Sequence, residues 1–204
     1  PAPRLATGRL LPLASRRVGR QLLAVLDQLA LSRGFAGWIE KTPRHLRYLP
    51  FLERLSERTH FVHVLRDGVD TVASLLAASR SWPQRYDLAT CIQRWNRDVA
   101  FSLSRLRRPN DHFVFYEDLT RQPEATLEPL LGALGLEWEE GLAERYGQGA
   151  ERLIADGERW KAGVGDGVRP AASSAGSGLS PQQLETAQRG LRHELYTRLR
   201  ERAA

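Results

Sequence analysis

Residues 60–74 read HFVHVLRDGVDTVAS, and this stretch decides the fold class. Its first part, residues 60–65, is bulky almost throughout and rich in β-branched and aromatic side chains, which is typical of a strand covered on both faces in a parallel sheet. A helix is predicted over residues 69–79, with Asp67 or Gly68 near its N-terminal cap. A strand that leads directly into a helix is the building unit of α/β proteins.

The rest of the chain continues this alternation of strands and helices. Apolar residues at helical spacing predict an amphipathic helix over residues 17–31, which Gly34 would end, and a long helix over residues 86–107. The remaining predicted elements are a short strand at 37–40, a helix that begins at Thr42-Pro43, a strand at 112–116, a helix at 123–134 and a terminal helix at 181–202. We therefore predict an α/β fold with a parallel sheet flanked by helices.

Composition excludes several classes of protein. The chain has 204 residues, which is long enough to form a hydrophobic core. Its content of 42% apolar and 26% charged residues is typical of globular proteins and excludes a collagen or a wholly disordered chain. Cys91 is the single cysteine, which excludes an internal disulfide framework and a multi-cysteine zinc site. No apolar run reaches the roughly 18–20 residues of a membrane span, and no signal peptide is visible. From the arginine-rich, cysteine-poor composition we expect a cytoplasmic, bacterial protein.

The net charge of +6 is concentrated near the N-terminus. Residues 1–37 hold six arginines and one acidic residue, Asp27, whereas the remainder is nearly balanced. A nucleic-acid binder usually spreads its basic residues over a patch of the folded domain, so no nucleic-acid partner is predicted. The local excess fits either an anionic partner of this segment or a solvated, arginine-rich helix face.

Arg66 and Ser74 are the first candidate binding residues. Ligands of open α/β sheets bind beyond the carboxyl ends of the strands, where Arg66 is expected to lie. Positions 67, 70/71 and 74 share one face of the following helix, so Arg66 and Ser74 can converge on one anion as a guanidinium fork and a hydroxyl donor. The alternative is an Arg–Asp pair that only closes the strand-to-helix turn.

The two lysines of the chain, Lys41 and Lys161, are further candidates beside 28 arginines. Residues 40–43, EKTP, stand where a predicted strand ends and a helix begins, and the positive potential of a helix N-terminus favours an anionic ligand near Lys41. Residues 159–161, RWK, lie in a glycine-rich loop at 155–180 that could fold over a nucleotide. In each case the alternative is an ordinary surface or packing role.

In this order and spacing, these elements resemble the sulfotransferase family that uses 3'-phosphoadenosine 5'-phosphosulfate (PAPS), and most closely its bacterial and Golgi-type members. The likeness covers about residues 38–162. It rests on EKTP at 40–43, on an RDxxDxxxS element at 66–74, on YEDL at 116–119 and on LGL at 134–136. We interpret the acids of YEDL as mainly structural. The resemblance implies a P-loop-NTPase-like fold and a PAPS-dependent sulfotransferase activity.

The resemblance also implies a role for each candidate residue. Arg66 and Ser74 would bind the 3'-phosphate of the nucleotide, and Lys41 would stabilise charge at the bridging oxygen of the phosphosulfate as its bond breaks. Arg159 and Lys161 would reach a phosphate from a loop that closes over the nucleotide. PAPS would be the co-substrate, and the acceptor would be a hydroxyl or amine on a small molecule, carbohydrate, lipid or peptide. No metal would be required.

We predict one sulfotransferase-like domain over the whole chain. Its parts would be an acceptor-side helical segment at 1–37, an α/β core at 38–154, a nucleotide-covering loop at 155–180 and a C-terminal helix at 181–204. Residues 1–37 contain no glycine-rich turn of the kind that holds the 5'-phosphosulfate in the family. The domain is therefore expected to be N-terminally incomplete, by truncation or by true absence of that loop, and could be inactive as it stands.

The general base and two other functions stay open. One branch of the family has a histidine two residues after the lysine, where this chain has Pro43, and other branches use an upstream glutamate, where residues 1–37 offer only Asp27. His45 is a nearby alternative. A nucleotide-dependent kinase of related topology would need an upstream phosphate loop and a metal-binding acid. A non-catalytic module would bind polyanions or a protein through residues 1–37.

Overall fold

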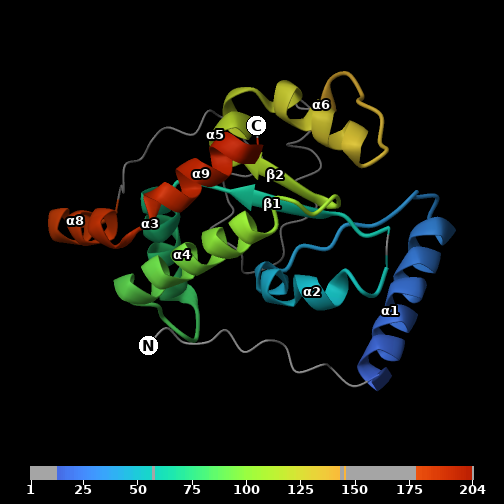
Figure 1. Ribbon diagram of the computed structural model, residues 1–204, viewed down its shortest axis with the longest axis horizontal. Coiled ribbons are helices and arrows are strands. Elements are labelled where there is room, and N and C mark those ends of the chain that lie inside the picture. Colours follow the sequence, from blue (N-terminus) through green and yellow to red (C-terminus); the bar gives the residue numbers. More distant parts are fainter. Residues whose placement is uncertain (1–12, 57, 143–144, 146–177, 204) are drawn as a thin grey trace. The chain divides into compact units, whose positions relative to one another are not determined.

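A computed structural model of the protein describes residues 13–56, 58–142, 145 and 178–203 (Figure 1). The chain divides into two compact units, residues 1–59 and 60–204. In the described residues, no helix is both long enough and apolar enough to cross a membrane.

The first unit begins with helix α1 (Leu13–Ser32), which confirms the helix predicted over 17–31. The helix ends at Gly34, whose φ of +78° is a conformation that glycine adopts without strain. The amide of Gly34 donates to the carbonyl oxygen of Leu31, and that of Phe35 to Ala30, both at 3.0 Å. This pair of hydrogen bonds is the Schellman ending of an α-helix.

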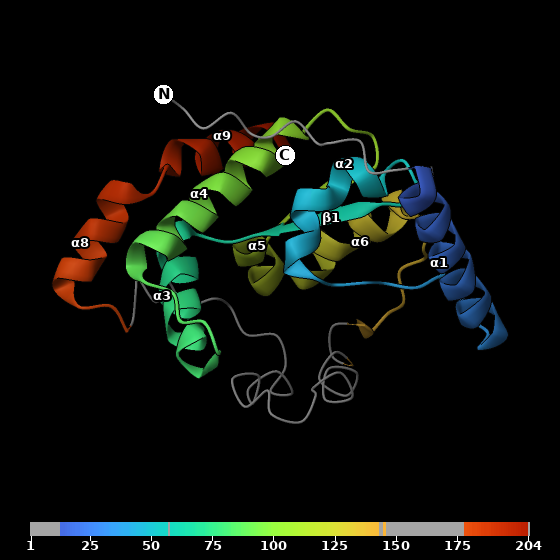
Figure 2. The ribbon, with the colours of Figure 1, turned by 90° about the horizontal axis from the view of Figure 1, so that it is seen from below.

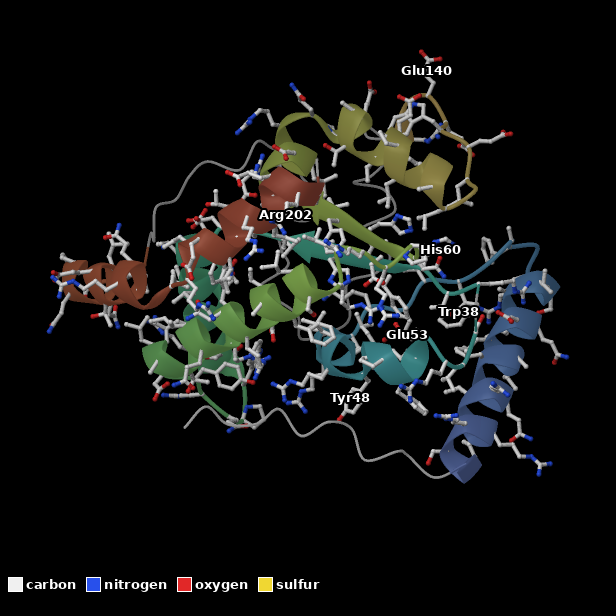
Figure 3. All side chains as sticks on the ribbon, in the orientation of Figure 1. Trp38, Tyr48, Glu53, His60, Glu140 and Arg202 are labelled. Atoms are coloured by element: carbon white, nitrogen blue, oxygen red, sulfur yellow. The ribbon has the colours of Figure 1, made fainter. Side chains whose placement is uncertain are left out.

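The short strand predicted at 37–40 is wrong, because residues 37–42 form no regular element. A strand forms only where a neighbouring strand supplies hydrogen bonds, and the described part of the first unit contains none. The indole Nε1–H of Trp38 instead donates to Asp27 Oδ1 of α1 at 2.9 Å. Trp38 therefore lies beside α1, where it ties this segment to the helix (Figure 3).

The helix predicted to begin at Pro43 is divided in two. A 3-10 helix, η1 (Pro43–Tyr48), is followed by a single turn of α-helix, α2 (Leu49–Leu52). Pro50 explains the division, because in a continuous α-helix its ring would clash with the carbonyl of the preceding turn and its nitrogen could donate no hydrogen bond.

The second unit is built on two parallel strands, β1 (Phe61–Leu65) and β2 (Asp111–Phe115), paired from Phe61↔Asp111 to Leu65↔Phe115. Its helices are α3 (Gly68–Ala78), the 3-10 turn η2 (Ser79–Ser81), α4 (Leu88–Ser104), α5 (Tyr116–Arg121), α6 (Pro123–Ala133), α8 (Pro181–Gly190) and α9 (His193–Ala203). Parallel strands joined through helices confirm the predicted α/β fold.

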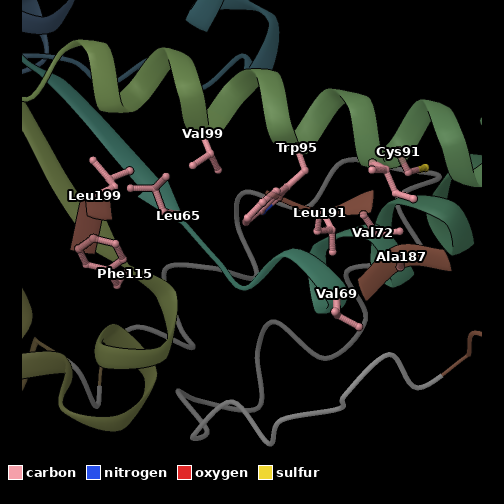
Figure 4. Close-up of a cluster of buried hydrophobic side chains, with 11 residues drawn as sticks. Leu65, Val69, Val72, Cys91, Trp95, Val99, Phe115, Ala187, Leu191 and Leu199 are labelled. Carbon is pink, nitrogen blue, oxygen red and sulfur yellow. The ribbon is translucent and has the colours of Figure 1, made fainter. Parts of the chain in front are cut away.

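Helices α4 and α9 run side by side along the sheet, and the core of the second unit lies beneath them (Figures 1 and 2). Val72, Cys91 and Leu199 are completely buried in this core. Figure 4 shows the buried cluster, which consists of Leu65, Val69, Val72, Cys91, Ile92, Trp95, Val99, Phe115, Ala187, Leu191 and Leu199. Residues of α8 and α9 thus complete a core that β1, α3 and α4 begin.

Strand β1 is covered on one face, not on both as predicted. His63 and Leu65 are buried, whereas Val62 and Val64 are 42% and 62% exposed. Because successive side chains of a strand point to opposite faces, this alternation follows from helices packing on the face of His63 and Leu65. The run of bulky residues could not show which face is exposed, because valine occurs on both the buried and the exposed face of a strand.

The single terminal helix predicted at 181–202 is broken at Leu191. Leu191 has an extended backbone and inserts its side chain into the core. Asn96 of α4 holds the break from both sides: its side chain donates to the carbonyl of Gly190 and accepts from the amide of Arg192, each at 2.8 Å. The side chain of Leu191 packs so closely on Gly68 that a Cβ there would lie 3.0 Å away.

A buried polar network joins the middle of β1 and the start of β2 to α4. His63 Nε2 lies 2.8 Å from Asp111 Oδ1, and His63 Nδ1 lies 3.0 Å from Ser102 Oγ. Arg105 donates to both oxygens of Asp111, at 2.5 and 2.7 Å. Burial is the main cause that lowers the pKa of His63 from its ordinary value of 6.5, against the opposing effect of Asp111. The imidazole is therefore neutral in the folded protein near pH 7.

This lowered pKa predicts that the second unit loses stability as the pH falls. The unfolded chain takes up a proton at His63 near pH 6.5 while the folded chain resists it, so the free energy of unfolding decreases below that pH. Chemical denaturation between pH 7.5 and 5.5 measures this dependence. We expect His63→Gln to flatten it and His193→Gln, which changes a half-buried histidine on α9, to leave it unchanged. Equal slopes in all three proteins would contradict the assignment to His63.

Candidate functional site

The turn formed by Arg66 and Asp67 follows β1 directly and is held by three groups. The Asp67 carboxylate caps α3 by accepting from the amides of Val69 and Asp70 at 2.8 and 3.1 Å. The indole of Trp95 donates to the carbonyl of Arg66 at 3.1 Å, and Glu117 Oε1 accepts from the amide of Asp67 at 2.8 Å. The backbone at the carboxyl end of β1 is thus fixed by α3, α4 and α5.

The Arg66 guanidinium lies between a carboxylate and an aromatic ring. Its Nη2 donates to Asp70 Oδ2 at 3.3 Å, and its carbon stands 4.8 Å from the centroid of the Tyr116 ring. The side chain is 31% exposed, and its Nε is buried without a hydrogen-bond partner among the described residues. A buried donor without an acceptor costs free energy, so an anion that accepts from this group would be favoured.

Of the two sequence interpretations of Arg66, the Arg–Asp pair is present in the structure, and anion binding stays a prediction. An Arg–Asp pair does form at the turn, but with Asp70 rather than with Asp67, which caps the helix. The pair uses Nη2, and within the described residues the buried Nε makes no hydrogen bond.

Ser74 is exposed on α3, one turn beyond Asp70. Positions 66, 70 and 74 follow one another at a spacing of four residues, so the Arg66 side chain extends toward the helix face that carries Ser74. The structure records no contact of Ser74 with Arg66, and among the described residues the Ser74 hydroxyl has no hydrogen-bond partner. Its convergence with Arg66 on one anion remains a prediction.

The acids of the YEDL segment hold the C-terminal helix, as their structural interpretation predicted. Glu117 Oε2 accepts from the Tyr196 hydroxyl at 2.8 Å, and Asp118 pairs with Arg200. Tyr116 does not end the strand but begins α5. Sequence spacing alone could not show that Glu117 also contacts the Arg66–Asp67 turn, since the partners are 50 residues apart.

Lys41 belongs to the first unit, where it is exposed on the segment that precedes η1. Its neighbour Glu40 makes two short contacts: Oε1 accepts from Thr42 Oγ1 at 2.5 Å, and Oε2 lies 2.6 Å from His45 Nδ1. The turn at Pro43 brings Glu40 and His45 together across Lys41. Glu40 and His45 are five residues apart with Pro43 between them, and this spacing is the feature of the sequence from which their contact could have been suspected.

Arg159 and Lys161 lie outside the described residues, and their roles remain predictions. In the described part of the chain, no three His, Cys, Asp or Glu side chains are grouped as metal ligands would be.

Comparison with known proteins identifies the family. A family model described as the Sulfotransferase family matches residues 12–140, more than half of the chain, and the chain therefore belongs to the sulfotransferase family. Among solved structures, it is similar to one titled "Sulfotransferase Domain from the Curacin Biosynthetic Pathway", with a TM-score of 0.58 and 16% sequence identity. The similarity covers 83% of this chain and 66% of that one, and it concerns the fold. A search of curated proteins found no match.

Proposed function

We propose that the protein transfers a sulfuryl group from PAPS to a hydroxyl or amine acceptor. The observation that carries this proposal is the Arg66 guanidinium, which directly follows β1 and whose buried Nε has no hydrogen-bond partner among the described residues, in a chain of the sulfotransferase family. Arginine binds phosphate groups well because its planar fork matches two oxygens at once. Arg66, helped by Ser74, would bind the 3'-phosphate of the nucleotide, and Arg159 or Lys161 would reach a phosphate from the loop that covers it.

The reaction would proceed by in-line displacement at sulfur. The acceptor oxygen or nitrogen forms a bond to sulfur, the bond from sulfur to the bridging phosphate oxygen breaks, and adenosine 3',5'-bisphosphate leaves. The acceptor gives up its proton to a base. The Lys41 ammonium would stabilise the negative charge that develops on the bridging oxygen, which is the kind of electrostatic stabilisation that often dominates catalysis.

His45 is the base that the geometry of the first unit supports. Its Nδ1 faces the Glu40 carboxylate at 2.6 Å, so the neutral ring would carry its proton on Nδ1 and leave the lone pair of Nε2 for the acceptor. The carboxylate would also stabilise the imidazolium that forms. A base oriented by an acid is a common arrangement for activating a nucleophile.

We expect His45→Gln to lower kcat roughly 100-fold, within the range usual for loss of a general base, and to leave nucleotide affinity unchanged. Glu40→Gln should have a smaller effect, because it removes the orienting charge but not the base. The measurement is release of adenosine 3',5'-bisphosphate from PAPS with a panel of hydroxyl and amine acceptors. A His45→Gln protein with full turnover would exclude this histidine as the base.

Calorimetric titration of this chain with adenosine 3',5'-bisphosphate tests the proposed function. Micromolar binding, weaker for adenosine 5'-phosphate, would support a site for the 3'-phosphate. A kinase would instead require a divalent metal for turnover. Binding to a polyanion such as heparin through the arginines of α1, steeply dependent on salt and without nucleotide affinity, would favour the non-catalytic module.

A further inference from the structure

We propose that Glu117 is a positioning residue: its carboxylate links helix α9 to the Arg66–Asp67 turn and so sets the place where Arg66 meets the 3'-phosphate. This inference rests on the proposed function. It gives the C-terminal helix, which holds none of the candidate binding residues, a part in nucleotide recognition.

Each oxygen of the Glu117 carboxylate accepts one of the two hydrogen bonds that form this link. Oε1 accepts from the backbone amide of Asp67 at 2.8 Å, and Oε2 accepts from the hydroxyl of Tyr196 on α9 at 2.8 Å. Arg200, one turn further along α9, lies 3.8 Å from the same Oε2. No other side chain in the described residues is recorded as accepting from the Asp67 amide.

Tyr196 also contacts the other groups that hold the turn. Its ring packs against Trp95 with centroids 5.9 Å apart, and Trp95 is the residue whose indole donates to the Arg66 carbonyl. Its ring also meets Phe115, the last residue of β2, edge to face at 5.7 Å. The carbonyl and the amide of the peptide group that joins Arg66 to Asp67 are thus held by Trp95 and Glu117, both of which Tyr196 contacts.

Charge and protonation keep the link intact. Burial and the neighbouring Glu117 raise the pKa of Tyr196, so its hydroxyl stays protonated and remains a donor. Arg200, which pairs with Asp118, also places a positive charge 3.8 Å from Glu117 Oε2. The residue before Glu117, Tyr116, is the ring that the Arg66 guanidinium covers, so α5 positions both the backbone and the side chain of Arg66.

The test compares the affinity for adenosine 3',5'-bisphosphate with that for adenosine 5'-phosphate in three variants. Glu117→Gln and Tyr196→Phe should each lower the ratio of the two affinities about 3- to 10-fold, as expected for loss of one or two hydrogen bonds that orient a ligand group. Asp118→Asn, which removes the ion pair with Arg200 and leaves both hydrogen bonds of Glu117 in place, should keep the ratio. A purely structural role of Glu117 would lower the melting temperature and weaken both nucleotides equally.

The Asp67 amide provides a readout that needs no nucleotide. In the intact protein its proton is expected well downfield in NMR spectra, because it is bound by a carboxylate, and it should move upfield in Glu117→Gln. If the intact chain shows no preference for the bisphosphate, both the proposed function and this inference are overturned. If it shows the preference and Glu117→Gln and Tyr196→Phe retain it, only the role of Glu117 is overturned.

Discussion

Arg66→Ala should weaken binding of adenosine 3',5'-bisphosphate about 100-fold, while affinity for adenosine 5'-phosphate stays within about twofold. A hydrogen bond to a charged group contributes about 1.5–3 kcal/mol, and 1.4 kcal/mol corresponds to a factor of ten in affinity. The variant removes the guanidinium whose Nε has no partner within the described structure, so the loss should fall on the 3'-phosphate. Titration calorimetry with the two nucleotides measures both values.

Arg66→Lys is the matched control for this prediction. It retains a positive charge beside Asp70 and loses the planar fork, so an intermediate affinity for the bisphosphate is expected. Thermal unfolding of each variant checks that the α3 cap at Asp67 remains intact. An Arg66→Ala protein that binds the bisphosphate as tightly as the parent would place the 3'-phosphate elsewhere.

Lys41→Met should reduce the rate of sulfuryl transfer roughly 100- to 1,000-fold and change nucleotide affinity little. Removal of one group that stabilises transition-state charge has costs of this size, and the effect falls on kcat because the charge on the bridging oxygen develops only as its bond breaks. Methionine keeps the length of the side chain and removes its ammonium group. Release of adenosine 3',5'-bisphosphate from PAPS at saturating nucleotide provides the measurement.

Arg44→Met is the matched control, because Arg44 is an exposed cation three residues further along the chain, in η1. It should retain most of the activity. An equal loss in the two variants would point to the general positive potential of this segment, and an unchanged Lys41→Met protein would remove the lysine from the reaction.

Most elements of the second unit could be predicted, because neighbouring residues in the sequence determine where they begin and end. The β-branched run before Arg66 and the cap at Asp67 define the β1–α3 unit within a few residues. The apolar residues of α4 recur at helical spacing, so this helix can be recognised without knowing which elements it packs against. Gly135, directly after the helix predicted at 123–134, has a positive φ of +71° that glycine adopts without strain. Such features depend on backbone preferences and spacing, which the sequence displays directly.

Features that depend on distant partners could not be predicted. The break between α8 and α9 is held by Asn96, which is 94 residues before Gly190. The segment at 37–40 has the composition of a strand, but pairing decides whether a strand forms. The two hydrogen bonds of Glu117 form only because β1 and β2 pair in this register and α9 packs beside them. At the candidate site, residue types were therefore predictable from motifs, whereas the contacts that position them were not.

The burial of Leu199 and Ala187 in the core also bears on how the protein is made. Both follow β2 in the sequence, and both have no exposed surface. During synthesis, β1, α3, α4 and β2 leave the ribosome before the residues that cover Val72 and Cys91 exist. The growing chain must therefore carry an open apolar surface until α8 and α9 have been translated, a state prone to aggregation. Chaperone protection should matter most in that interval, and it should end when α9 docks.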